Sequence, residues 1–125
     1  MKRVIECGDE ILMIKNSYGG WGKWMFPGGG VGKNEAPESV AEREIMEEVG
    51  VKGNNFQKIG EYISSKEYKR DTVSVFKCSA NTRVIKIDPG EISEAKWFKL
   101  NNLPEVSNYS KDILNMLKSS KKSHG

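Results

Sequence analysis

The sequence predicts an α/β fold, a sandwich of strands and helices within one domain. Segments rich in β-branched and aromatic residues, which favour strands, lie on both sides of a segment with apolar residues at helical spacing. A second segment with helical spacing lies near the end of the chain. The length of 125 residues suits one domain with a core of its own.

The first predicted elements are two strands joined by a tight turn. Arg3–Cys7 and Glu10–Lys15 are rich in apolar residues, and the Gly8-Asp9 pair between them is a hairpin signal. Lys23–Phe26 is a candidate short strand before a glycine-rich segment. The N-terminal part is therefore expected to form a β-hairpin.

A helix is predicted from Pro37 to Val49. Proline is favoured in the first turn of a helix, and Gly50 is a typical residue to end one. Later strands are expected at Phe56–Ser64, Thr72–Ala80, Ala95–Leu100 and, with a less regular pattern, Arg83–Ile87. The apolar residues of Ser110–Leu117 predict a closing amphipathic helix.

Three glutamates lie close together on the first predicted helix. Glu44 is one turn from both Glu47 and Glu48, and like charges at this spacing repel each other. At about 100 degrees per residue, one row is apolar and should face a core: Pro37, Ala41, Ile45 and Val49. Glu44 and Glu48 border that row and Glu47 lies just beyond, whereas Met46 and Arg43 lie closer to the opposite side.

This pattern leaves two interpretations open. Carboxylates beside a core are partly dehydrated, which costs free energy unless they are paired or bound to a metal. Three carboxylates suit a hard cation such as Mg²⁺ or Mn²⁺, which would relieve their repulsion. A structural network of ion pairs can produce the same pattern.

The segment 29–51 also follows a longer motif. It reads as a glycine, five residues, a glutamate, seven residues, and then Arg-Glu-apolar-any-Glu-Glu-any-Gly-apolar. Every fixed position is matched, by Gly29, Glu35, Arg43, Glu44, Ile45, Glu47, Glu48, Gly50 and Val51. Similar flanking features are Trp24–Gly29, Glu91, Trp97-Phe98 and Leu103-Pro104. The chain therefore resembles, over nearly its whole length, the Nudix (MutT-type) hydrolase family, which implies an α/β/α sandwich with a mixed β-sheet.

The resemblance implies a metal site on the helix. Glu44, Glu47 and Glu48 would be the ligands of Mg²⁺ or Mn²⁺, and the backbone carbonyl at Gly29 would complete the site. Such an ion can neutralise an anionic diphosphate, position water and stabilise the leaving phosphate.

Other residues of the 29–51 motif, called the box from here on, are expected to support these ligands. Arg43 would hold a carboxylate in place, with Glu47 and Glu35 as its candidate partners. Glu35 and Gly50 would serve the structure of the box.

The base that activates water is less transferable within the family. Glu48 is the first candidate, and Glu91 and Glu94 are candidates from a later part of the chain. For both of these, a solvent-exposed carboxylate without a role is the alternative.

Four residues are candidates for substrate binding. Trp24 and Tyr68 could stack on a base, and Lys66 and Arg70 could contact phosphates. The alternatives are a core position for Trp24 and a solvated basic turn for the lysine and arginine.

The resemblance implies hydrolysis of a phosphoanhydride bond in a nucleoside diphosphate linked to another moiety. Nucleoside triphosphates and dinucleoside polyphosphates are the favoured substrates. The alternatives are an inactive nucleotide-binding module, disfavoured because no box glutamate is replaced, and removal of pyrophosphate from RNA 5′ ends. The general base, the number of metal ions and the oligomeric state are left open.

Charge and composition also limit which ligands and which kinds of site chemistry are expected. A net charge of +3 is compatible with an anionic small molecule and too small to indicate a nucleic-acid groove. Cys7 and Cys78 lack metal-ligand spacing and are interpreted as buried free thiols. His124 is the only histidine and lies in the polar C-terminal segment, so histidine-based zinc or triad chemistry is not expected.

Location and domain bounds follow from the same composition. A membrane span needs about 20 apolar residues in a row, and neither such a run nor a secretory signal is found. The cytoplasm is therefore the expected location. Residues 1–118 are predicted to form the domain, and residues 119–125 a flexible basic tail.

Overall fold

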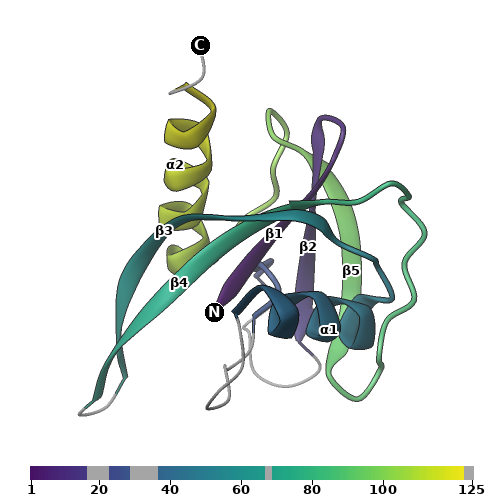
Figure 1. Ribbon diagram of the computed structural model, residues 1–125, viewed down its shortest axis with the longest axis horizontal. Coiled ribbons are helices and arrows are strands. Elements are labelled where there is room, and N and C mark those ends of the chain that lie inside the picture. Colours follow the sequence, from purple (N-terminus) through teal and green to yellow (C-terminus); the bar gives the residue numbers. More distant parts are fainter. Residues whose placement is uncertain (17–22, 29–36, 67–68, 123–125) are drawn as a thin grey trace.

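The structure, a computed structural model, describes residues 1–16, 23–28, 37–66 and 69–122. Its elements are β1 (Lys2–Cys7), β2 (Glu10–Asn16), α1 (Pro37–Val49), β3 (Asn54–Lys66), β4 (Lys69–Ser79), β5 (Ile92–Lys99) and α2 (Asn108–Lys122). The strands form one sheet in the order β3-β4-β1-β2-β5, in which β1 and β4 are parallel and the other neighbours antiparallel. The two helices lie on different sides of the sheet (Figure 1), so the predicted α/β/α sandwich with a mixed sheet is confirmed.

The middle strand β1 contributes side chains to both layers of the sandwich. Ile5 packs with the core beneath α1, and Val4 packs with the core beneath α2, as the alternation of a strand requires. The turn from β1 to β2 contains Gly8 with a φ of 63°, a conformation that glycine adopts without strain. Cys7 pairs with Glu10 across this turn, which confirms the predicted hairpin.

Each helix covers its own apolar cluster. The cluster on the α1 side contains Ile5, Cys7, Leu12, Ile14, Ile45, Val49, Val51, Cys78, Ala80 and Ile92. The cluster on the α2 side contains Val4, Ile11, Met13, Phe26, Val75, Val106, Ile113, Leu114 and Leu117. The two cysteines are buried and free, as the sequence predicted. The sheet is therefore apolar on both faces where the helices cover it.

Helix α1 has the bounds that the sequence predicted. It ends at Val49, and the N–H of Gly50 donates to the carbonyl of Met46 at 3.1 Å. Gly50 has a φ of 66°, so a glycine suits this position after the helix. The helix that carries the glutamates is thus closed at its C-terminal end by the residue expected there.

The strand predicted at Arg83–Ile87 is wrong. These residues lie outside the sheet, because the segment bonds to the end of α1 instead: the N–H of Lys86 donates to the carbonyl of Val49, and that of Asp88 to the carbonyl of Glu48, both at 2.9 Å. The apolar residues that suggested a strand, Ile85 and Ile87, pack against the α1-side core. The segment therefore satisfies helix carbonyls that would otherwise have no partner.

Several element bounds also differ from the prediction, and the bounds of β1 to β5 shift by a few residues. Met25 forms an isolated bridge with Ile14, and Trp24 forms one with Val106, so Lys23–Phe26 is not a full strand. Helix α2 begins at Asn108 because the hydroxyl oxygen of Ser107 accepts from the N–H of Ser110 at 3.3 Å, a typical N-cap. It continues to Lys122, so residues 119–122, predicted as flexible tail, are helical, since lysine is a good helix former.

None of the helices in the described ranges has the length and apolar character needed to cross a membrane.

Candidate functional site

A buried arginine joins the two helix glutamates that border the core. Nη1 of Arg3 lies 3.3 Å from Oε2 of Glu44, and Nη2 of Arg3 lies 3.4 Å from Oε1 of Glu48. The arginine side chain is 0% exposed, and the carboxylate side chains are 16% and 18% exposed. The strand β1 and the helix α1 therefore meet through two ion pairs at the edge of the core.

The local sequence explains this placement. Ala41, Ile45 and Val49 are all fully buried against the sheet, which fixes the rotation of α1 about its axis. Glu44 and Glu48 are one turn apart and lie at the border of that apolar row. The helical-wheel prediction that both carboxylates are partly dehydrated is confirmed.

Burial dominates the electrostatics of Glu48. It raises the pKa of this carboxyl above its ordinary value of 4.5, and the positive charge of Arg3 only partly opposes the effect. The negative charges of Glu44 and Glu91 raise the pKa further. The charged form of Glu48 is thus less stable here than in water, which is the situation a bound cation would correct.

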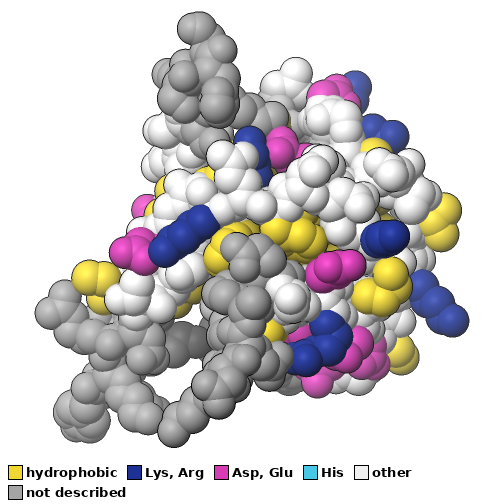
Figure 2. Space-filling view, in the orientation of Figure 1, with side chains coloured by type: hydrophobic (Ala, Val, Ile, Leu, Met, Phe, Trp, Pro, Cys, Tyr) yellow, Lys and Arg dark blue, Asp and Glu magenta, His cyan; other side chains and the backbone are white. Residues whose placement is uncertain are grey.

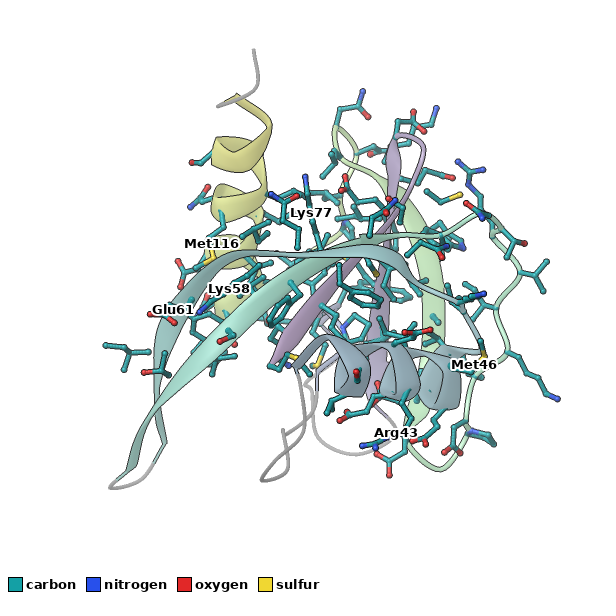
Figure 3. The ribbon with its side chains drawn as sticks, viewed as in Figure 1. Arg43, Met46, Lys58, Glu61, Lys77 and Met116 are labelled. Carbon is teal, nitrogen blue, oxygen red and sulfur yellow. The ribbon has the colours of Figure 1, made fainter. Side chains whose placement is uncertain are left out.

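The third predicted ligand faces another way. Glu47 is 65% exposed, and its Oε1 lies 3.9 Å from Nε of Arg43 one turn earlier. The geometry agrees with the expected Arg43–Glu47 partnership, although an exposed pair of this kind contributes little stability. Figure 3 shows Arg43 pointing away from the sheet, on the far side of α1.

The outer face of α1 carries a shallow cavity of about 500 Å³. It is lined by Ser39, Glu42, Arg43, Met46, Glu47 and Lys52. Charged side chains of both signs gather over α1 in Figure 2. This cavity includes Glu47 but neither Glu44 nor Glu48, so the structure separates the predicted ligands into a pair and a single residue.

The paired carboxylates suit a hard divalent cation. Glu44 and Glu48 each use one oxygen for Arg3, and carboxylate oxygens are the ligands that Mg²⁺ prefers. The guanidinium of Arg3 contacts both carboxylates, and the charge of Glu44 also acts on the N-terminal ammonium of Met1, whose pKa burial lowers and this charge raises. In the part of the chain that the structure describes, no group of three His, Cys, Asp or Glu side chains could hold an ion. A complete ligand set would need Glu47 or groups outside the described residues.

The two candidate auxiliary bases lie on different sides of the sheet. Glu91 is in the turn that follows Asp88, close enough to Glu48 for its charge to raise the pKa there. Glu94 pairs with Lys15 on β2, and Lys15 is on the same face of the strand as the α2-side residue Met13, two positions earlier. Glu94 therefore lies on the face of the sheet opposite the one that α1 covers, so of the two candidates only Glu91 lies on the side of Glu48.

Trp24, a candidate for substrate binding, is partly buried and packs against the α2-side core. Its ring packs edge-on against Phe98, with ring centroids 5.0 Å apart, and Nζ of Lys15 lies over it. This face of the sheet is opposite the one that bears Glu44 and Glu48. The packing of Trp24 agrees with the alternative of a core position.

Several candidates lie outside the described residues. They are Gly29, Glu35 and Tyr68, together with the side chains of Lys66 and Arg70. Their roles stay predictions from the sequence.

Arg3 is the one residue of this cluster that the sequence interpretation missed. The available signal was the alternation of β1: Arg3 shares a strand face with Ile5, which packs beneath α1. An arginine at a core-facing position needs an acidic partner. Nothing local indicates which one, because Glu44 and Glu48 lie more than forty residues away along the chain.

Comparisons with known proteins match this chain to a family. A model of the NUDIX domain matches residues 3–118. Diphosphoinositol polyphosphate phosphohydrolase 3-alpha of Mus musculus is 30% identical over 112 residues, covering 86% of this chain and 66% of that protein. NAD-capped RNA hydrolase NudC of Shigella dysenteriae is 31% identical over 103 residues, covering 81% of this chain and 38% of that protein. The chain thus spans only part of the length of these relatives.

Solved structures are similar in fold. A MutT NUDIX hydrolase from Burkholderia pseudomallei matches with a TM-score of 0.77 and 22% identity, over 92% of this chain and 96% of that one. The NUDIX domain of NrtR from Shewanella oneidensis, solved in complex with ADP ribose, matches with a TM-score of 0.79 and 15% identity, over 95% of this chain and 84% of that one.

Proposed function

The chain belongs to the NUDIX domain family, and we propose that it is a metal-dependent hydrolase of phosphoanhydride bonds. Its substrate class is a nucleoside diphosphate linked to another moiety, with nucleoside triphosphates and dinucleoside polyphosphates favoured. The proposed cofactor is Mg²⁺ or Mn²⁺, and the proposed location is the cytoplasm.

The adjacent carboxylates of Glu44 and Glu48 carry this proposal. They lie at the edge of the core with 16% and 18% of their side chains exposed, and the guanidinium of Arg3 contacts one oxygen of each. Partial dehydration of a carboxylate costs free energy, and a bound divalent cation offsets that cost. The box glutamates are all retained, which an inactive binding module would not require.

Each residue of the site would have its own role in the hydrolysis. Glu44 and Glu48 would hold the ion, with Glu47 as a further ligand. A bound divalent ion would neutralise the diphosphate and lower the pKa of a water molecule. Glu48, whose pKa is raised by burial, is the first candidate to accept a proton from that water, and Glu91 is the second. Arg43 would orient Glu47.

A substrate panel with product identification tests this function. The panel contains nucleoside triphosphates, dinucleoside polyphosphates and ADP-ribose, each with Mg²⁺, with Mn²⁺ and with EDTA. The names of the relatives add two arms, an NAD-capped RNA and a diphosphoinositol polyphosphate. Metal-dependent turnover of a nucleotide-linked diphosphate is the expected result, and the products identify the bond that is cleaved.

Matched variants connect turnover to the site. Glu44→Gln and Glu48→Gln remove a charge and keep the shape, so each should lower kcat at least about 100-fold. Glu42→Gln is the control, because Glu42 is an exposed glutamate on the same helix and is not at a fixed position of the motif. No turnover with any substrate and either metal would favour the inactive binding module. Loss of activity in Glu42→Gln as large as in Glu48→Gln would contradict the assignment.

A further inference from the structure

Arg3 is an unusual component of a hydrophobic layer. It is the largest fully buried side chain, and among the described residues its Nε has no hydrogen-bond partner. Its neighbours on β1, Val4 and Ile5, are core residues. Burying a guanidinium costs free energy that its ion pairs must offset. Packing alone therefore does not explain an arginine at this position.

The two ion pairs of Arg3 are long for charged groups. They measure 3.3 and 3.4 Å, whereas charge-assisted bonds between nitrogen and carboxylate oxygen are typically about 2.7–2.9 Å. The guanidinium also contacts only one oxygen of each carboxylate, Oε2 of Glu44 and Oε1 of Glu48. This contact holds the two carboxylates next to each other and leaves one oxygen of each for another cation.

We propose that Arg3 is a positioning residue that serves as the internal counter-cation of Glu44 and Glu48, and that a divalent ion competes with it for their charge. The inference rests on the proposed metal site. Without metal, Arg3 keeps two partly dehydrated carboxylates side by side. With metal, the positive charge of Arg3 remains close and lowers the affinity of the carboxylates for the ion.

This role predicts effects of opposite sign for stability and metal binding. Arg3→Met keeps much of the side-chain length and removes the charge, so the metal-free protein should be less stable. The same variant should bind Mn²⁺ about tenfold more tightly, because a nearby positive charge has been removed. Arg3→Lys retains a cation at this position and should bind Mn²⁺ more weakly than Arg3→Met.

The experiment measures Mn²⁺ binding and thermal unfolding without substrate. Binding is followed by calorimetry, and the midpoint Tm is recorded in EDTA and in saturating Mn²⁺. The expected result is a larger rise in Tm on adding Mn²⁺ for Arg3→Met than for the wild type. Arg83→Met is the control, because Arg83 is a half-exposed arginine that pairs with Glu10. It should leave both the Mn²⁺ affinity and the Tm rise unchanged.

The outcomes separate this inference from the proposed function. A wild type that binds no Mn²⁺ would overturn the metal-dependent function, and the role of Arg3 with it. A wild type that binds Mn²⁺, with Arg3→Met binding equally or more weakly, would overturn the role of Arg3 alone.

A double variant covers the case in which Arg3→Met does not fold. Arg3→Met combined with Glu44→Gln removes one positive and one negative charge together, and its Mn²⁺ affinity is compared with that of Glu44→Gln alone. Tighter binding in the double variant supports the inference. Equal or weaker binding refutes it.

Discussion

Gly50 provides a quantitative test of how the C-terminal end of α1 is stabilised. Its φ of 66° lies in the left-handed region, where a residue with a Cβ costs about 1–2 kcal/mol. A Cβ built at this position would lie 2.9 Å from Cβ of Lys86 and 3.1 Å from its carbonyl oxygen. The contact concerns backbone as well as side chain, so Lys86 would have to move.

Movement of Lys86 would weaken a backbone bond that closes the helix. Its N–H donates to the carbonyl of Val49 at 2.9 Å, and losing a hydrogen bond of this kind costs about 1 kcal/mol. Gly50→Ala should therefore lower the free energy of unfolding by about 2–3 kcal/mol, the sum of the backbone and hydrogen-bond costs. For a domain of this size, that corresponds to a fall in Tm of about 10 °C.

Urea unfolding followed by circular dichroism measures this change, and Gly90→Ala is the matched control. Gly90 has no left-handed φ, and a Cβ there would meet only the Asp88 carboxylate at 3.4 Å. The control should change stability by less than about 0.5 kcal/mol. If Gly50→Ala lost no more stability than Gly90→Ala, the argument from the left-handed end of α1 would fail.

Three further predictions concern the core and its ionisable groups. Ile45→Ala should lower the free energy of unfolding in urea by about 3–4 kcal/mol, because Ile45 is fully buried. Met46→Ala, at a position 48% exposed, should lower it by less than about 1 kcal/mol. Equal losses would contradict the orientation of α1. Burial raises the pKa of Glu48 above 4.5, so the folded protein binds that proton more tightly than the unfolded chain. The free energy of unfolding in EDTA should then fall as the pH rises from 4.5 through the raised pKa, and Glu48→Gln should flatten this decline, which an unchanged pH profile would disprove. Burial also raises the pKa of Cys78 to about 12, so iodoacetamide at pH 8 should label it, by peptide mass spectrometry, only after unfolding; rapid labelling of the native protein would show that the thiol is accessible.

Local patterns were sufficient for most of the fold. The bounds of α1 follow from Pro37 and Gly50, and the first hairpin follows from Gly8-Asp9 between apolar segments. The segment 83–87 shows where local patterns fail. Its apolar residues do pack on the core, but its backbone bonds to the end of α1, and β-propensity cannot distinguish the two environments.

The site was predicted less completely than the fold, for a geometric reason. The wheel placed Glu44 and Glu48 correctly beside the core, because the apolar row sets the rotation of the helix. Glu47 comes from the same motif, yet it pairs with Arg43 on the exposed side of α1. Spacing along a helix therefore indicates which carboxylates can meet, while the packing of the helix decides which of them share one environment.

The counter-charge of the site comes from another element altogether. The motif on α1 supplies the carboxylates, but their dehydration is set by the sheet beneath them, and the guanidinium between them is supplied by β1. The position of Arg3 beneath α1 depends on the sheet, because the parallel pairing of β1 with β4 sets Arg3 opposite Phe76. A motif that describes the helix alone can therefore specify the ligands of a cation and still omit the residue that we propose to control their affinity for it.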